Sequence, residues 1–579
     1  MSRSAAWFFL VIVLGIFAVF LIWPIWQIVR VAFIGIPTDG QSTVFTLGYF
    51  KHIFLDPVLR RGLINSAAIA ICVTILCTVI TLPLAMLSVR TEFTGKNALT
   101  ALLLVPLVLP PFVGAIGLRQ ILGRYGALTA IFQRLHIVGP NQPIDFFAAR
   151  VAGVIIIEAL SLYPILYLNL TAALANFDPA MEQAAANLGA SRWTIFRRIT
   201  LPLLRPGLFA GATIVLIWSF TELGTPLMFD FYTVTPVQIF HRLTQITGNP
   251  LPYALVVVML IGSALLYAVG RFILGRRHDA AVGKASTQST ARRLSGFKAL
   301  AAATPFIIIA TLALLPHIGV ILMSFSKVGA WYQSIIPRAF TLDHYNNGLT
   351  HSFTIPSVRN SIAYSAASVA IDIALGLAIA WLIVRSSLPG RKLIDHLSML
   401  PLAVPGIVLA FGYLAISLQL QTWIGKDHPR LRELVDATEN PTLLLIAAYS
   451  MRRLPYVVRS AVAGLEQTPR DLELAAQNLG ASHWLTMRRV TIPLIAANLV
   501  AGALLAFAFA MLEVSDSLIL AQRQAFWPIT KAIYELFQRL GDGPYIASAL
   551  GVWAMTLLAL TLLTANNLLG RKMGAMFRI

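Results

Sequence analysis

The chain has 579 residues, of which 58% are hydrophobic and only 12% are charged, and its formal net charge at pH 7 is +20. Soluble globular proteins carry roughly 25% charged residues, so this composition excludes an ordinary soluble fold and predicts that most of the chain lies in lipid. The basic residues fall in short loops between apolar runs, so we expect no nucleic-acid partner. Cys72 and Cys77 share one apolar run, which favours neither a disulfide framework nor a metal site.

Apolar runs of about 20 residues recur along the chain, and each is long enough to cross roughly 30 Å of hydrocarbon. They are continuous, so we expect helices, which satisfy their own backbone in lipid, rather than the alternating strands of a barrel. The first run is too long for a signal peptide and is expected to remain as a span. The predicted fold class is an all-α integral membrane protein with twelve transmembrane helices, near residues 6–34, 61–88, 99–121, 150–174, 207–230, 253–275, 299–325, 360–385, 395–418, 441–464, 498–521 and 546–568.

The second half of the chain repeats the first. Gly189, Pro202 and Glu222 reappear 291 residues later as Gly480, Pro493 and Glu513, and Asn65, Arg90 and Pro110 reappear 295 residues later as Asn360, Arg385 and Pro405. Six spans per half give both halves the same orientation, so a pseudo-two-fold axis is expected along the membrane normal. We predict two parallel, pseudo-symmetric six-helix modules at 1–275 and 299–579, joined by a linker at 276–298.

The linker is polar, basic and rich in small residues. Because positively charged loops stay in the cytoplasm, it is predicted to be cytoplasmic, and six spans on each side then place both chain ends in the cytoplasm. The basic tail at 570–579 agrees, and the loops expected on the other side hold fewer lysines and arginines. The expected location is the bacterial inner membrane, crossed several times, with membrane lipid around the spans.

One polar stretch occurs twice, as EQAAANLGASRWTIFRRITLP at 182–202 and as ELAAQNLGASHWLTMRRVTIP at 473–493. The alanines favour a helix, the glycine ends it, the serine caps a second short helix, and the proline ends that helix. The pattern predicts a cytoplasmic helix–turn–helix whose small residues let another protein approach closely; a helix that only anchors to lipid headgroups is the alternative. The residues expected to matter are Glu182, Ala184, Ala185, Gly189, Ser191 and Pro202, and Glu473, Ala475, Ala476, Gly480, Ser482 and Pro493.

The repeated stretch resembles the cytoplasmic EAA loop of type I ABC importer permeases, the membrane subunits of binding-protein-dependent, ATP-driven uptake systems. Both copies match from Ala-Ala through the glycine to the late proline. Both depart at the glutamate of the family pattern, where Gln183 and Leu474 stand, with Glu182 and Glu473 one residue earlier. The resemblance implies that each copy is a coupling helix docked on one of two copies of a cytoplasmic ATP-binding subunit. It also implies that a periplasmic solute-binding protein delivers the solute.

The segments YSMRRLPYVVRSAVAGLEQTPRDLELAAQNLGAS and FTELGTPLMF are similar to the fused double-module permeases of the ferric-iron type, whose relatives carry phosphonates, sugar phosphates, thiamine and polyamines. The resemblance implies ferric iron as the solute, with a phosphonate or another small organophosphate or organic solute as the alternative. An ion-coupled secondary transporter is the alternative from another class, but it leaves the duplicated loop unexplained.

The chain holds no phosphate-binding loop. The nearest strings, VGKAST and TGKNAL, lack both the first glycine and the hydroxyl residue that would hold Mg²⁺. We therefore expect no catalytic residue and no cofactor in this chain, with ATP and Mg²⁺ bound on the partner subunits.

Charged residues stand inside several expected spans, where each costs roughly 2.5–3.5 kcal/mol to insert and is a candidate for function. Those predicted to line a translocation pathway are Glu222, Glu513 and Asp516 in the fifth spans and Arg452 and Arg453 in the fourth span of the second module. In the alternative interpretation, the acidic residues form hydrogen bonds to a neighbouring helix or lie in water near the outer end of the span. The arginines suit an anionic substrate, or else extend to cytoplasmic headgroups. Prolines at 106, 110, 111, 401 and 405 predict kinked or broken third spans.

Overall fold

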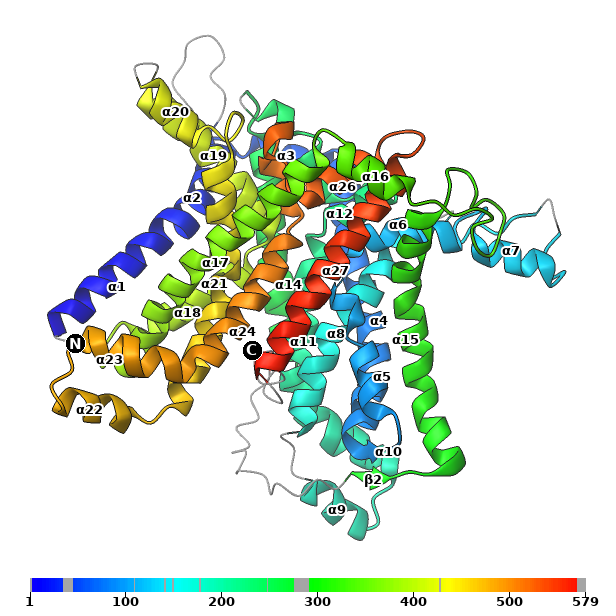
Figure 1. Ribbon diagram of the computed structural model, residues 1–579, viewed down its shortest axis with the longest axis horizontal. Coiled ribbons are helices and arrows are strands. Elements are labelled where there is room, and N and C mark those ends of the chain that lie inside the picture. Colours follow the sequence, from blue (N-terminus) through cyan, green and yellow to red (C-terminus); the bar gives the residue numbers. More distant parts are fainter. Residues whose placement is uncertain are drawn as a thin grey trace. The chain divides into compact units, whose positions relative to one another are not determined.

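A computed structural model describes residues 3–34, 45–108, 110–139, 142–147, 150–175, 179–246, 248–274, 291–425 and 428–569. These residues fold almost entirely into helices (Figure 1). Within these ranges, ten helices are long and apolar enough to cross a membrane. The prediction of an all-α membrane protein is therefore confirmed. Most of the predicted linker and the basic tail lie outside the described residues.

Two further expected spans differ from a plain apolar helix. The run at 99–121 is divided between two arms, Lys96–Leu107 and Pro111–Arg134, that are bent by 104°. The run at 441–464 is a single helix, α21 (Thr442–Gln467), but Arg452, Arg453 and Arg459 make it more polar than the others. The twelve expected spans thus correspond to ten apolar helices, one bent pair and one charged helix among the described residues.

The chain folds as two compact units, the first from residues 1–60, 235–260 and 343–576 and the second mainly from 61–234 and 261–342. The unit boundary at residue 260 falls within α14 (Leu251–Leu274). The other helices of the first unit are α1 (Arg3–Phe17), η1 (Ala18–Ile22), α2 (Trp23–Ala32), α3 (Gly48–Leu55), α13 (Thr235–Phe240), η4 (Leu243–Gln245), α16 (Asp343–Thr350), α17 (Thr354–Arg385), α18 (Arg391–Ala403), α19 (Gly406–Ile424), α20 (Pro429–Val435), α21, α22 (Arg470–Asn478), α23 (His483–Thr486), η5 (Met487–Thr491), α24 (Ile492–Met511), α25 (Ser515–Leu520), η6 (Gln524–Phe526), α26 (Ile529–Phe537) and α27 (Gly543–Leu569).

The second unit carries most of the first half of the sequence. Its helices are α4 (Pro57–Arg90), α5 (Lys96–Leu102), η2 (Val105–Val108), α6 (Pro111–Leu122), α7 (Ala127–Arg134), α8 (Val151–Ala175), α9 (Ala180–Asn187), α10 (Arg192–Ile195), η3 (Phe196–Thr200), α11 (Leu201–Phe220), α12 (Gly224–Met228) and α15 (Gly296–Phe325). Two short parallel strands, β1 (Thr91–Glu92) and β2 (Arg292–Arg293), join the end of α4 to the segment that precedes α15.

Each unit contains the opening helix of the other half of the sequence. In the first unit α2 packs on α19, and nearby the Tyr413 hydroxyl donates to the carbonyl oxygen of Phe20 at 2.6 Å. In the second unit α15 crosses α6 so closely that a Cβ atom on Gly117 would lie 2.3 Å from the carbonyl oxygen of Pro316. Small residues allow such close helix crossings in membranes. The compact units therefore differ from the sequence modules at 1–275 and 299–579, which remain a prediction from the repeat.

The third spans are broken by proline in both halves. Pro110 precedes α6 with φ −57° and ψ 138°, and Pro405 precedes α19 with φ −57° and ψ 139°. Proline lacks an amide hydrogen and its ring clashes with the preceding helical turn, so a helix starts more easily after it than continues through it. The prediction that these prolines break the third spans is confirmed.

The fifth spans are also broken, which the sequence did not predict. We expect unbroken spans at 207–230 and 498–521, but α11 and α24 end at Phe220 and Met511, and the short helices α12 and α25 follow. Glu222 and Glu513 stand in these two breaks. Irregular backbone at membrane depth is tolerated only where protein or a water-filled cavity surrounds it, so both breaks are candidates for function.

Candidate functional site

The repeated stretch folds as a helix–turn–helix in each unit. α9 ends at Asn187 and α22 at Asn478, and two residues later Gly189 and Gly480 have φ angles of +83° and +91°. The amide of Gly189 donates to the carbonyl of Ala186 and the next amide donates to the carbonyl of Ala185, both at 3.0 Å, and the second copy repeats this pattern. Such a turn requires positive φ, which glycine adopts without strain. The predicted glycine stops are therefore confirmed.

A serine caps the next helix in each copy, as predicted. Ser191 Oγ accepts a hydrogen bond from the amide of Thr194 at 3.2 Å, and Ser482 Oγ accepts one from the amide of Leu485 at 3.2 Å. This side-chain acceptor satisfies one of the free amides at the start of a helix. Within the first unit α22 and α23 lie at the opposite end from α20, and within the second α9 and α10 lie at the opposite end from α7 (Figure 1).

The prediction that this second helix ends near the proline is wrong. The helix continues through Pro202 to Phe220 in the first copy, and through Pro493 to Met511 in the second. The π-helical turns η3 and η5 end two residues before these prolines. A wider π turn separates the proline ring from the carbonyl that it would meet in an α-helix. The repeated stretch is therefore joined to the fifth span by continuous helix.

The glutamate of each copy forms an ion pair within its own unit. Arg385, the last residue of α17, donates from Nε to Glu473 at 3.1 Å and from Nη2 to the carbonyl of Thr468 at 2.9 Å. Arg90, the last residue of α4, pairs with Glu182 through Nη2. The glutamate that stands one residue before the family position thus contacts the second span of its own half.

The opposite side of each turn is exposed and apolar. Leu188 and Leu479, just before the glycines, are 89% and 90% exposed. Trp193 and Trp484, just after the caps, are 67% and 72% exposed. Large apolar side chains gathered on a surface mark a site of contact with another molecule.

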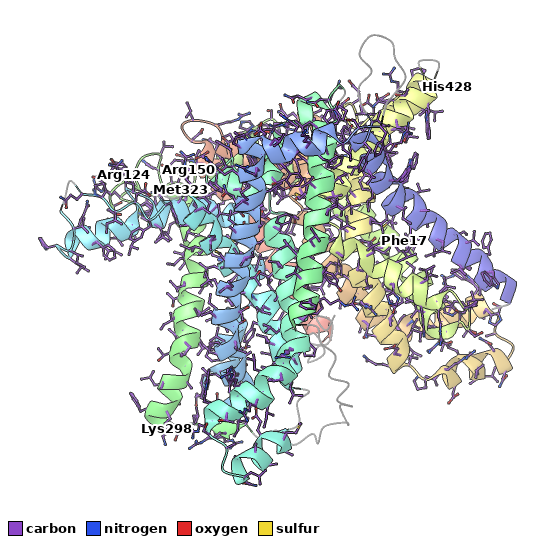
Figure 2. The ribbon with its side chains drawn as sticks, turned by 180° about the vertical axis from the view of Figure 1, so that it is seen from behind. Phe17, Arg124, Arg150, Lys298, Met323 and His428 are labelled. Atoms are coloured by element: carbon purple, nitrogen blue, oxygen red, sulfur yellow. The ribbon has the colours of Figure 1, made fainter. Side chains whose placement is uncertain are left out.

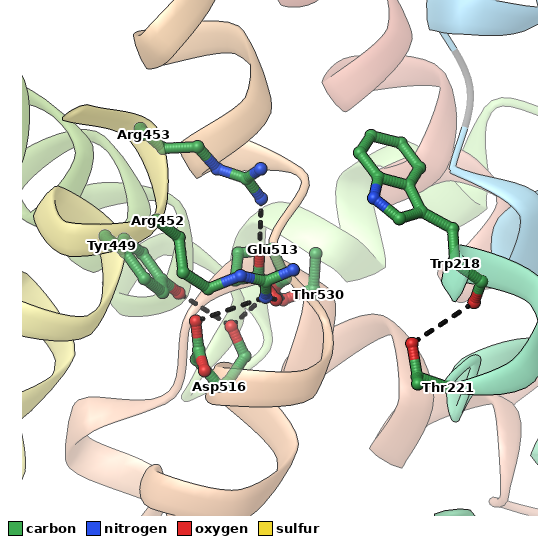
Figure 3. Close-up of polar contacts among 9 residues, drawn as sticks. Trp218, Thr221, Tyr449, Arg452, Arg453, Glu513, Asp516 and Thr530 are labelled. Carbon is green, nitrogen blue, oxygen red and sulfur yellow. Dashed lines mark hydrogen bonds and ion pairs between the residues drawn. The ribbon is translucent and has the colours of Figure 1, made fainter. Parts of the chain in front are cut away.

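Apart from the repeated stretch, the first unit contains a cluster of buried charges. Arg452 and Arg453, from α21, both pair with the carboxylate of Glu513 in the break after α24 (Figure 3). The side chains of Arg453 and Glu513 are 8% and 4% exposed. Both arginines therefore bind the carboxylate of Glu513. They do not extend toward lipid headgroups, as the alternative interpretation expected.

Hydroxyl groups and a second acid complete this cluster. Asp516 is fully buried and lies 3.5 Å from Arg452 Nη1 through Oδ2, while its Oδ1 has no hydrogen-bond partner among the described residues. The backbone carbonyl of Glu513 accepts from the hydroxyls of Thr530 at 2.7 Å and Ser517 at 2.6 Å. The broken backbone at Glu513 is thus held by side chains, as buried carbonyl groups require.

Glu222 occupies the equivalent break in the second unit but has different partners. Its Oε1 accepts from the amides of Gly224 at 3.1 Å and Thr225 at 3.2 Å, so it caps α12. The first half carries Ser161 and Leu162 where the second carries its two arginines. The two glutamates therefore share a position, while the arginine pairing belongs to the second half.

Two further acids, buried within the spans, lie outside the predicted set. Asp372 in α17 accepts from the Ser450 hydroxyl at 2.6 Å, and Glu158 in α8 accepts from the Ser219 hydroxyl. Each is a lone acid in an apolar run, which was a usable signal, but the repeat gave no support because neither has an acidic counterpart in the other half. Among the described residues, no group of three or more His, Cys, Asp or Glu side chains is placed to hold a metal ion.

Helical spans, paired loops and broken helices together define a membrane permease, a transport subunit rather than an enzyme. The sequence pattern of the binding-protein-dependent transport system inner membrane component family matches residues 78–279 and 372–570. The chain belongs to this family. It is therefore a multi-pass inner-membrane permease subunit of an ATP-driven importer that works with a binding protein.

Relatives span most of the chain. It is 27% identical over 515 residues to the putative ferric transport system permease protein FbpB 1 of Haemophilus influenzae, covering 84% of this chain and 74% of the relative. It is 27% identical to the ferric transport system permease protein FbpB of Actinobacillus pleuropneumoniae, covering 90% and 72%. Among solved structures, it is similar to a bacterial ABC transporter that imports alginate, with a TM-score of 0.37, 16% identity, and coverage of 45% of this chain and 92% of that one.

Proposed function

We propose that this chain is the permease through which ferric iron enters the cell, supplied by a periplasmic solute-binding protein. Relatives that match 84%, 90% and 91% of this chain are named for ferric transport. The molybdenum permease ModB of Mycobacterium tuberculosis matches over 89% of its own length but only 41% of this chain. A phosphonate or another small organophosphate is the second candidate, because guanidinium groups suit phosphoryl oxygens. Arg452 and Arg453 already pair with Glu513, which makes iron the first candidate.

The duplicated loop is the observation that carries the coupling proposal. Each copy presents an exposed leucine and an exposed tryptophan around a fixed glycine turn, and continues as unbroken helix into the fifth span. Two copies of a cytoplasmic ATP-binding subunit dock on the two loops, one on each, and hold the ATP and Mg²⁺. Movement of a docked subunit then turns directly into movement of α11 or α24, since no flexible segment lies between loop and span.

Glu222, Glu513 and Asp516, with Arg452 and Arg453, line the translocation pathway in this proposal. Hard, highly charged cations prefer oxygen ligands such as carboxylates. Glu222 and Glu513 stand where the fifth spans lose helical form, and broken helices form the substrate sites of many transporters. Oδ1 of Asp516 has no hydrogen-bond partner among the described residues and offers an acceptor.

The loops lie on the cytoplasmic side, and both chain ends lie there as well. In the second unit Lys298 stands at one end of α15 and Met323 at the other, and the basic end is the one near α9 and α10 (Figures 1 and 2). Arg488 and Arg489 stand in the second copy of the loop. Positively charged segments next to spans stay in the cytoplasm, which supports this orientation.

Co-purification with the ATP-binding subunit and the binding protein tests the proposal. We expect two ATP-binding subunits per chain, and uptake of ferric iron that stops when ATP is depleted. An ion-coupled transporter would instead purify without an ATPase, and its uptake would survive ATP depletion but stop when the ion gradient is collapsed. Thermal-shift measurements on the binding protein with ferric iron and with a phosphonate separate the two solutes.

A further inference from the structure

The docking helices have two faces that serve different contacts. In α22 the only buried residue is Glu473, and in α9 Glu182 and Ala185 are less exposed than their neighbours. Gln183 and Leu474, which occupy the glutamate position of the family pattern, are both exposed. One face of each helix therefore turns toward its own unit, and the other remains open to a partner.

The inward face is held by an arginine that joins several elements. Arg385 ends α17 and binds both Glu473 on α22 and the carbonyl of Thr468, the residue that follows α21. Arg385 and Glu473 have side chains that are 9% and 10% exposed, so water competes little for this pair. Three elements thus meet at a single guanidinium group.

The first half has the same ion pair, but its third partner is a threonine hydroxyl rather than a backbone carbonyl. Arg90 ends α4 and pairs with Glu182 on α9, and the Thr200 hydroxyl in η3 donates to the same carboxylate. The arginine also stands at the carboxyl end of a long helix, where a positive charge is favoured. The two halves therefore share one arrangement, in which the second span is fastened to the docking helix.

We propose that Glu182 and Glu473 are positioning residues that fasten each docking helix to the second span through Arg90 and Arg385. Each docking helix follows the fourth span in the chain and continues through the Gly189 or Gly480 turn into the fifth, and the ion pair adds a connection to the second span. A docked ATPase that displaces the helix moves the second and fifth spans together. This inference rests on the proposed coupling function.

The test uses the whole importer, reconstituted with its ATP-binding subunits and binding protein. The variants are Glu473→Gln, Glu473→Arg, Arg385→Glu, and the double exchange of Arg385→Glu with Glu473→Arg. Glu182 and Arg90 supply a matched second set. Glu466→Gln is the control, because Glu466 is exposed at the end of α21, only a few residues from the pair. The readouts are the amount of ATPase that co-purifies and the solute taken up per ATP hydrolysed.

We expect the single variants to keep the docked ATPase but to lower solute uptake per ATP by about tenfold, within the range of coupling between paired charges. The double exchange should restore uptake per ATP to within about threefold of the native value. A single variant that does not assemble, rescued by the double exchange, also supports the pair. Native uptake per ATP in Glu473→Gln, or a double exchange no better than its parents, would overturn the inference. Failure of the native chain to bind the ATPase would instead overturn the proposed function.

Discussion

The guanidinium group of Arg452 lies against the backbone of Gly406, so closely that a Cβ atom on Gly406 would be 2.2 Å from Nη1. Gly406 is the first residue of α19, directly after the break at Pro405. In the first half, Pro111 is the residue equivalent to Gly406, and Ser161 of α8 is the residue equivalent to Arg452. The first half therefore has no arginine at this contact. Gly406 thus provides the space in which Arg452 reaches Glu513 and Asp516.

Replacing that glycine should disturb the charge cluster. Gly406→Ala forces the guanidinium group away from Glu513, and overpacking of this kind costs about 1–3 kcal/mol. We expect a lower thermal unfolding temperature in detergent and reduced uptake with the ATPase still bound. Gly348→Ala is the matched control, because its Cβ atom would meet only a methyl group of Ile546 at 3.7 Å. Equal behaviour of the two variants would contradict the contact between Gly406 and Arg452.

The two arginines of α21 should differ in what their loss costs. Removing one partner of a buried ion pair costs about 3–5 kcal/mol, because the remaining charge is left without compensation. Arg453→Ala is therefore expected to lower the stability of the purified protein strongly. Arg452 is more exposed, at 17% of its side chain, so Arg452→Ala should weaken uptake more than assembly. Chemical unfolding and uptake are measured on both, with the exposed Arg430→Ala as control; a stable Arg453→Ala would count against the buried pair.

The glycine turns should be essential for docking and unimportant for insertion. Gly189→Asp or Gly480→Asp places a side chain at positive φ, where a residue other than glycine is strained, and adds charge to the docking surface. We expect each variant to reach the membrane in normal amounts but to lose both ATPase binding and uptake. Gly248→Asp is the control, since Gly248 also faces open space but has no positive φ. Normal uptake in both turn variants would refute the coupling role.

A pH-dependent contribution to stability is expected at the start of α4. Asp56 Oδ1 accepts from the amides of Leu59 at 3.0 Å and Val58 at 2.8 Å, and these bonds, that to Leu59 first, lower the pKa of Asp56. A carboxyl group with a lowered pKa in the folded state adds stability above its unfolded pKa of about 3.9 and loses it as the pH falls through the folded value. Asp56→Ala should therefore cost about 1 kcal/mol at neutral pH and progressively less below about pH 4.

Thermal unfolding of the detergent-solubilised protein at pH 7 and in acid measures this difference. Asp56→Asn is the control, because asparagine keeps the cap without titrating. A cost of Asp56→Ala that stays the same in acid would show that the ionised carboxylate is not what stabilises the start of α4.

Much of this architecture could be predicted because lipid restricts the choices. Long apolar runs have to be helices, so the spans follow from composition, and Pro110 and Pro405 mark real breaks because proline removes a backbone donor. The turns at Gly189 and Gly480 were also predictable, since a local sequence signal fixes a local backbone angle.

The remaining features depend on contacts that a single sequence does not state. Pro202 was expected to end a helix, but a π-helical turn before it lets the helix continue into the fifth span. The pairing of Arg453 with Glu513 joins residues 60 positions apart in sequence, and nothing local distinguishes it from an arginine that reaches lipid headgroups. Glu158 and Asp372 lie outside the predicted set, and neither has an acidic counterpart in the other half of the sequence.

The most direct measurement of the coupling claim is site-specific cross-linking between this chain and its ATP-binding subunit. Leu188→Cys and Leu479→Cys place a thiol on each exposed turn, in a background in which Cys72 and Cys77 are replaced. Leu540→Cys is the control, since Leu540 is 98% exposed and follows α26, at the other end of the first unit from α22. We expect both turn thiols to cross-link the ATP-binding subunit and the Leu540→Cys thiol not to. Cross-links from the Leu540→Cys thiol, or turn thiols that react only from the outer side of the membrane, would contradict the account.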